Sequence, residues 1–142
     1  MQVIDGNATW YCLCPGGSCP SGRSGACGCN GQALHIAWPN ETTTNCNDQC
    51  GTNPALPCNR SIYVYDYCTS TGNWGCIRDC CPCRSQEGCS LAPGCCSGSG
   101  YGCNWVTPLL DLTEAFFINI QGSLTVGRIA VEVTIPDEVY SC

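Results

Sequence analysis

Two aspartates lie at the margins of apolar segments, where a carboxyl group can face a groove rather than bulk water. Asp66 comes near the end of the β-forming run at 61–67, and Asp111 stands between Leu110 and Leu112. A carboxyl group in such a place can donate or accept a proton in acid–base chemistry. Aspartates at strand ends are also frequent turn caps, so the residues alone leave both roles open.

Aromatic residues are the second candidate functional group. Tyrosine and tryptophan in exposed segments offer flat apolar faces with a polar edge, which suit binding of ligands such as sugar rings. The candidates in this chain are Trp10, Tyr11, Tyr67, Trp74, Tyr101 and Trp105. The alternative for each is core packing, and it is strongest for Trp10 because that residue lies in a predicted strand.

Cysteine is the dominant feature of the composition. The chain has 142 residues and 18 cysteines, an even number that permits complete disulfide pairing. Disulfides persist in oxidising compartments and are rare in the cytosol, so we expect a secreted, extracellular protein. N-glycosylation acceptor patterns at Asn7, Asn40 and Asn59 agree with that location.

Charge and hydropathy argue against several classes of function. The net charge is −6, and the five cationic residues are scattered arginines, which predicts no nucleic-acid partner. No run of 18 apolar residues is present, so we expect no membrane-spanning helix. His35 is the only histidine, and the Cys80-Cys81-Pro82-Cys83 run favours disulfides over a zinc site in an oxidising compartment. We therefore expect no metal and no cofactor.

Periodicity predicts a mainly β chain. Short strands are expected at 7–11 and 61–67, and the alternation of Ile129, Val131, Val133 and Ile135 with smaller or polar residues predicts a strand over 127–135. Thr113 is expected to cap a short helix that Gly122 ends. Residues 76–103 hold eight cysteines and few aliphatic residues, which predicts a loop-rich lobe held by disulfides.

Four segments, taken in order, resemble expansins and the family 45 glycoside hydrolases. They are Ala8-Thr9-Trp10-Tyr11, Gly25-Ala26-Cys27-Gly28-Cys29, Ile62-Tyr63-Val64-Tyr65-Asp66-Tyr67-Cys68 and Leu110-Asp111-Leu112-Thr113-Glu114-Ala115-Phe116. The third is also similar to a segment of barwin-like proteins. The resemblance runs the length of the chain and implies a single six-stranded double-psi β-barrel domain over 1–142, with one or two short helices, long disulfide-rich loops and the 76–103 lobe inserted.

The resemblance also implies a function and a site. It implies a monomeric protein that acts on cell-wall polysaccharide, β-1,4-glucan or cellulose, with Asp111 as general acid, Asp66 as its neighbour and Thr9 as a hydrogen-bonding partner. Inverting hydrolysis needs a second carboxylate roughly 6.5–9.5 Å from the acid. The segments where family 45 hydrolases place that base contain no acid here, and the sequence does not choose among Asp5, Asp48 and Asp79 as substitutes. Hydrolysis therefore stays an open alternative.

A non-enzymatic function is the second hypothesis. Barrels of this kind also occur in barwin-like defence and structural proteins, and a fold does not fix a function. On this hypothesis the 76–103 lobe is the functional surface and Asp111 is dispensable for carbohydrate binding.

Overall fold

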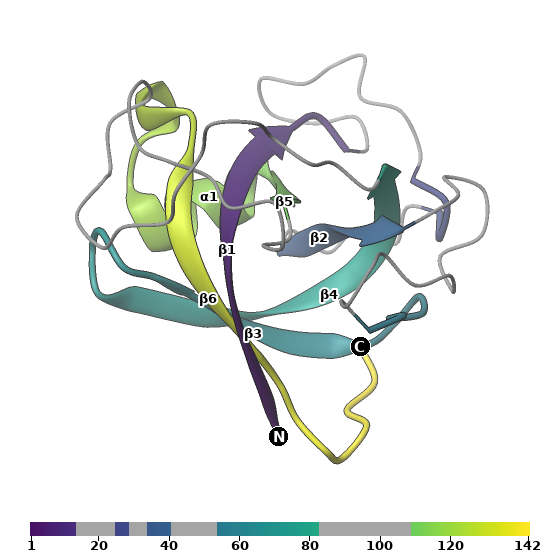
Figure 1. Ribbon diagram of the computed structural model, residues 1–142. Helices are drawn as coiled ribbons and strands as arrows, with labels where there is room; N and C mark the ends of the chain where they lie inside the picture. Colours follow the sequence, from purple (N-terminus) through teal and green to yellow (C-terminus); the bar gives the residue numbers. More distant parts are fainter. Residues whose placement is uncertain (14–24, 29–33, 41–53, 83–108) are drawn as a thin grey trace.

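Six strands close into a barrel in the computed structural model, which describes residues 1–13, 25–28, 34–40, 54–82 and 109–142 (Figure 1). The order around the barrel is β1-β5-β2-β4-β3-β6. The strands are β1 (Gln2–Tyr11), β2 (His35–Asn40), β3 (Ser61–Asp66), β4 (Thr71–Pro82), β5 (Leu109–Thr113) and β6 (Ile129–Ile135). Helix α1 (Glu114–Gln121) and the short 3-10 helix η1 (Leu124–Val126) connect β5 to β6.

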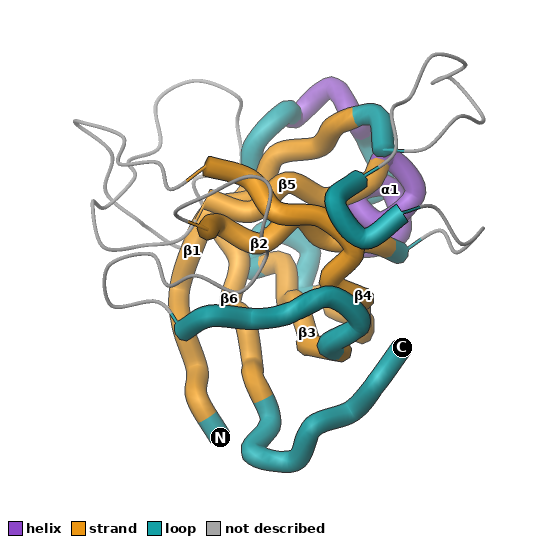
Figure 2. Tube along the Cα trace, turned by 90° about the vertical axis from the view of Figure 1, so that its right-hand side faces the viewer, coloured by secondary structure: helices purple, strands orange, loops and turns teal. Residues whose placement is uncertain are grey.

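The barrel mixes parallel and antiparallel pairs. β1 runs parallel to β5 and β2 runs parallel to β4, whereas the other four neighbouring pairs are antiparallel. Figure 2 shows α1 beside the barrel, next to the end of β5. The predicted mainly β class with six strands and short helices is confirmed.

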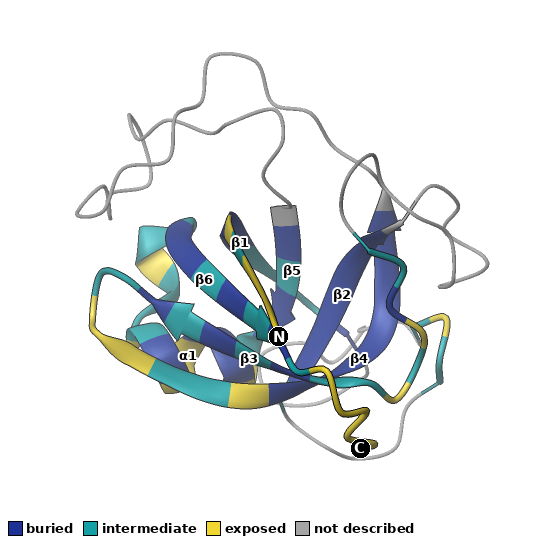
Figure 3. Cartoon of the chain, turned by 60° about the horizontal axis from the view of Figure 1, so that its bottom comes forward, coloured by how far each residue is buried: buried dark blue, intermediate teal, exposed yellow. Residues whose placement is uncertain are grey.

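The core follows the alternation that the sequence predicts. In β3 the side chains of Ile62, Val64 and Asp66 are buried while their neighbours are partly exposed, and β6 buries Val131 and Val133 in the same way. Figure 3 shows this change of burial along the strands. Because successive side chains of a strand point to opposite faces, one face of each strand supplies the apolar centre of the barrel.

Strand β4 corrects one sequence-based expectation. Residues 76–82 were expected to begin a loop-rich lobe, but they form the second half of β4, and residues 75–81 are buried. Long-range contacts explain the difference: β3 pairs with the first half of β4, β2 pairs with the second half from Cys76 onward, and the turn at 25–28 bonds to Arg78 and Asp79. The rest of the predicted lobe, 83–103, lies outside the described residues.

Helix α1 begins and ends at the predicted residues. Thr113 occupies the N-cap position, but its hydroxyl accepts the backbone N–H of His35 rather than one from the helix. Gly122 ends the helix in a left-handed conformation, φ 90°, and its N–H donates to the carbonyl of Ile118. The helix buries Phe116 and Phe117 against the barrel. Gly75 of β4 makes that packing possible, since a Cβ there would lie 2.0 Å from a ring carbon of Phe116.

Disulfides connect segments that are far apart in the chain. Cys27 bonds Cys58, and Cys76 of β4 bonds Cys142. Cys12, Cys68 and Cys80 are disulfide-bonded as well. No helix among the described residues is long and apolar enough to cross a membrane.

The asparagines of the N-glycosylation patterns differ in their surroundings. Asn7 is 2% exposed inside β1, so the folded chain leaves no room for a glycan there. Asn59 lies in an exposed turn, but its side-chain oxygen accepts a hydrogen bond from the guanidinium of Arg78. Glycosylation at Asn40 stays a prediction.

Candidate functional site

Four side chains share one register row across β1, β5, β2 and β4. Thr9 is opposite Asp111, Asp111 is opposite Ala37, and Ala37 is opposite Asp79. Residues directly opposite each other on paired strands project to the same side of the sheet. Thr9 and Asp111 alternate with the core residues Ala8, Leu110 and Leu112, so the row lies on the side away from the apolar centre. It brings two carboxyl groups to one face with a small residue between them.

Asp111 is held by its neighbour on β1. The hydroxyl of Thr9 donates to Oδ1 of Asp111, and it also lies 3.3 Å from the carbonyl oxygen of Leu110. Both side chains are partly exposed. The predicted hydrogen bond between Thr9 and Asp111 is therefore present.

Asp79 is the second carboxylate of the row, and it is 6% exposed. Its Oδ2 accepts the hydroxyl of Tyr11 at 2.9 Å, and its Oδ1 accepts the backbone N–H groups of Ala26 and Cys80 at 2.8 and 2.9 Å. Burial raises the pKa of the Tyr11 hydroxyl, and the charges of Asp79 and Asp111 raise it further. The Tyr11 hydroxyl therefore stays a neutral hydrogen-bond donor to Asp79.

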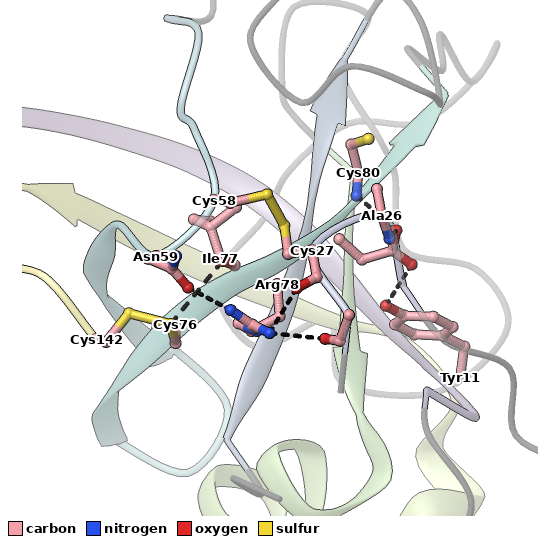
Figure 4. The surroundings of a disulfide bond; sticks show 12 residues. Tyr11, Ala26, Cys27, Cys58, Asn59, Cys76, Ile77, Arg78, Cys80 and Cys142 are labelled. Atoms are coloured by element: carbon pink, nitrogen blue, oxygen red, sulfur yellow. Dashed lines mark hydrogen bonds between the residues drawn. A yellow bond between two sulfur atoms is a disulfide. The ribbon is translucent and has the colours of Figure 1, made fainter. Parts of the chain in front are cut away.

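The Gly25-Ala26-Cys27-Gly28 motif is the turn that covers Asp79. Cys27 donates its N–H to the carbonyl of Arg78, and Ala26 donates to Asp79 itself (Figure 4). Gly25 has no room for a side chain, because a Cβ would lie 2.7 Å from the carbonyl oxygen of Arg78 and 2.9 Å from Cβ of Asp79. Gly28 has φ +75°, which favours glycine. The motif thus fits a close approach of this turn to β4.

Arg78 fastens the same turn from the other side. It is 7% exposed, and its guanidinium donates to the carbonyls of Cys27 and Gly28 at 2.6 and 2.8 Å and to the side chain of Asn59. Figure 4 shows the guanidinium between Asn59 and Cys27, near the Cys27–Cys58 disulfide. A buried cation needs acceptors for its donors, and the turn supplies two of them, while Nε of Arg78 has no partner among the described residues.

Asp66 is not brought to this row. It ends β3, which is three places from β5 in either direction around the barrel. It is 0% exposed, and its Oδ1 accepts the backbone N–H of Cys68 at 2.8 Å, as in a turn cap. Burial raises the pKa of Asp66, and hydrogen bonds from Cys68 and Thr69 oppose that rise. The geometry gives Asp66 a structural position, distant from Asp111.

The predicted aromatic residues separate into different places. Trp10 packs against the core, and its indole N–H donates to the carbonyl of Leu124 at 3.1 Å. The hydroxyl of Tyr67 bonds the carboxylates of Asp5 and Glu132, and burial together with these bonds raises its pKa. Trp74 is 45% exposed and lies on β4, five residues before Asp79. Tyr101 and Trp105 lie outside the described residues.

Asp79 is the site residue that sequence reasoning did not select. A partial signal was present, since Asp79 follows an apolar residue by two positions and precedes a cysteine, as Asp66 does. The density of cysteines after 76 favoured a loop over a strand and hid this pattern. The register shift between Ile36 and Ala37, which turns Asp79 to the face opposite Ile77, is not visible in the sequence. His35 is buried and structural: its pKa is lowered by burial and by the charge of Arg78. No group of metal-binding side chains occurs within the described ranges.

Comparison with known proteins finds similarity at the level of structure. No family model matches the chain, and no curated protein matches it. The crystal structure of apo Clavibacter michiganensis expansin superposes with a TM-score of 0.54 and 17% sequence identity, over 96% of this chain. The fold is expansin-like. The match confirms the double-psi β-barrel that the sequence motifs imply, and the chain spans about half the length of that expansin, 52%.

Proposed function

We propose that this expansin-like barrel binds cell-wall polysaccharide of the β-1,4-glucan type along the Thr9–Asp111 row. The observation that carries the proposal is the hydrogen bond from Thr9 to Asp111 on a partly exposed face of the barrel. An oriented carboxyl group can accept hydrogen bonds from sugar hydroxyls or protonate a glycosidic oxygen. The structural likeness to an expansin and the four sequence motifs support the same class of ligand.

The surroundings of the two acids favour binding without hydrolysis. An inverting hydrolase needs a carboxylate that activates a water molecule. Asp79 is nearly buried, and its two oxygens accept three protein donors, from Tyr11, Ala26 and Cys80. A water molecule would have to displace Tyr11 before Asp79 could take its proton. Asp111 would then act alone, as proton donor or as polar contact to the sugar chain.

Inverting hydrolysis is the second candidate function, and the register of the strands favours it. Asp111 and Asp79 are each opposite Ala37, so two interstrand spacings of about 4.8 Å separate their Cα atoms. The resulting distance of roughly 10 Å can accommodate the acid–base separation of an inverting enzyme. On this alternative Asp111 is the acid and Asp79 is the base.

Three isosteric variants distinguish these functions. We expect Asp111→Asn to lose most glucan binding or wall-loosening activity, while Asp66→Asn, a matched loss of a carboxylate across the barrel, leaves it intact. Cello-oligosaccharides released from carboxymethyl-cellulose or lichenan, with loss of release in Asp79→Asn, would establish the glucanase. Unchanged binding and activity in a folded Asp111→Asn variant would overturn the proposal.

Secretion as a monomer completes the proposal. The disulfides of Cys27, Cys58, Cys76 and Cys142 link segments far apart in the chain, and such bonds form in the oxidising secretory pathway. Extracellular polysaccharide is accessible only to a protein of that compartment.

A further inference from the structure

Three aromatic rings surround a hollow away from the Asp111 row. Tyr63 of β3 and Tyr140 each meet Trp74 of β4 edge-on, with ring centroids 5.5 and 6.0 Å apart and interplanar angles of 70° and 71°. The hollow has a volume of about 610 Å³ and is lined by Met1, Ser61, Tyr63, Trp74, Thr134, Pro136 and Tyr140. These residues come from the N-terminus, β3, β4, β6 and the segment after β6, whereas the carboxylate row spans β1, β5, β2 and β4.

This hollow keeps large aromatic surfaces in contact with solvent. Trp74 is 45% exposed and Tyr140 is 48% exposed, which makes them the only exposed aromatic residues of the described chain. A ring with this much free surface does little to stabilise the barrel core. Exposed aromatic groups that gather around a hollow are typical of binding sites.

The chemistry of the lining selects a neutral, hydroxylated ligand. No described residue that lines the hollow has a charged side chain, and the one lining residue with a charged group, Met1, pairs its α-ammonium with the carboxylate of Asp137. Hydroxyl groups occur beside the rings, on Ser61, Tyr63, Thr134 and Tyr140. The hydroxyl of Tyr140 donates to Glu138 at 2.8 Å, which leaves its oxygen available as an acceptor. A pyranose ring has apolar C–H faces, which can pack on the aromatic rings of the hollow. It also has hydroxyl groups at its edge, which can hydrogen-bond to the hydroxyl groups of the lining.

From these observations we infer that the Tyr63–Trp74–Tyr140 hollow is a second carbohydrate-binding site, which takes the sugar rings of a single neutral glycan chain. The edge-on angles matter for this assignment. Coplanar rings would form a flat platform for a crystalline surface, whereas rings at about 70° to one another form the walls and floor of a hollow. A soluble chain or chain end fits such a shape better than the flat face of a crystal.

The position of the hollow makes it independent of the carboxylate row. Trp74 and Asp79 are five residues apart on β4, which corresponds to about 16 Å along an extended strand. A short oligosaccharide in one site therefore leaves the other open, so two equivalents are expected to bind per protein. The inference extends the proposed function, and stoichiometry separates the two: the row accounts for one equivalent and the hollow for the other.

Calorimetric titration with a short soluble β-1,4-glucan oligosaccharide tests the inference, with tryptophan fluorescence as a second readout. We expect Trp74→Ala to weaken one of the two binding events about tenfold or more, as loss of a large aromatic anchor does, and to abolish the fluorescence change of the exposed indole. Trp74→Phe retains a ring and should recover part of the affinity. Ile118→Ala is the matched control, since Ile118 is 43% exposed on α1 and lies outside the hollow.

The outcomes distinguish the two proposals. If Asp111→Asn removes all binding and Trp74→Ala removes none, the hollow is not a carbohydrate site, although the proposed function stands. If Trp74→Ala removes one equivalent and Asp111→Asn has no effect, the inference stands and the proposed function fails. If the protein self-associates in sedimentation experiments and Trp74→Ala abolishes that association without altering sugar binding, the hollow is a protein interface, and the inference is overturned. Failure to bind any neutral glycan in an array overturns it equally.

Discussion

Substitution of Gly25 by alanine tests how the turn at 25–28 positions Asp79. A Cβ at this position would lie 2.7 Å from the carbonyl oxygen of Arg78, 2.8 Å from a methyl of Leu13 and 2.9 Å from Cβ of Asp79. Leu13 can rotate, but the carbonyl oxygen belongs to β4 and cannot move without disturbing the barrel. The added methyl group must therefore push the turn at 25–28 away from β4.

The expected magnitude follows from these contacts. Overpacking a close contact costs about 1–3 kcal/mol of folding free energy. Displacement of the turn also weakens the bond from Ala26 to Asp79, and a hydrogen bond to a charged group contributes about 1.5–3 kcal/mol. If the turn moves away from β4, the close contact is relieved but the bond to Asp79 weakens, so the two costs are not fully additive. We therefore expect Gly25→Ala to lower the free energy of unfolding by roughly 2–4 kcal/mol.

Chemical denaturation followed by tryptophan fluorescence measures this loss. Gly122→Ala provides the control: Gly122 has φ +90° and nothing within 4 Å of an added Cβ, so it reports backbone strain without crowding, about 1 kcal/mol. The Gly25 variant should also bind glucan more weakly than the control, since Asp79 loses a donor beside the row. A loss of stability below that of Gly122→Ala, with unchanged glucan binding, would refute the proposed packing of the turn.

Three further substitutions test the packing and the buried polar groups. Gly75→Ala should cost about 3 kcal/mol or more in denaturant unfolding, since its Cβ would overlap the Phe116 ring, and a cost below 1 kcal/mol would contradict the contact between α1 and β4. Because burial lowers the pKa of His35, the unfolded chain takes up its proton first, so stability should fall as the pH drops below about 6.5, and His35→Gln should remove that part of the slope. A slope unchanged by His35→Gln would show that His35 is not the group responsible. Burial raises the pKa of Asp66, and its Oδ2 has no hydrogen-bond partner among the described residues, so Asp66→Asn should stabilise the fold at pH 7 by roughly 1 kcal/mol. This advantage should be lost as the pH falls toward 4, because the carboxyl group of Asp66 is then protonated in the folded protein. Destabilisation at pH 7 would mean that the charge of Asp66 is compensated in the fold.

Local sequence patterns were sufficient to predict a strand where that strand has one apolar face. The alternation in β3 and β6 and the stop at Gly122 are all visible in the sequence, because each depends on residues a few positions apart. The same alternation puts Asp66 on the face of β3 that carries Ile62 and Val64, and the structure buries that face. The alternation could not place Asp66 around the barrel, since strand order depends on contacts between distant segments.

The second half of β4 shows why the rest of the site was missed. Arg78 and Asp79 are adjacent charged residues inside a cysteine-rich run, which is typical of a loop. Both are buried only because the turn at 25–28 provides carbonyl acceptors for the guanidinium and an N–H donor for the carboxylate. That compensation comes from a segment about 50 residues earlier in the chain, so no local pattern reveals it.

The most direct test of the central claim is NMR of the aspartate side-chain carboxyl groups during titration with a soluble β-1,4-glucan oligosaccharide. Asp111 is partly exposed on the row, whereas Asp66 is buried on the other side of the barrel, so one spectrum contains both the reporter and its control. We predict that the Asp111 signal shifts in a saturable way and that the Asp66 signal does not. A saturable titration that leaves the Asp111 carboxyl unchanged would contradict the assignment of the Thr9–Asp111 row as the polysaccharide site.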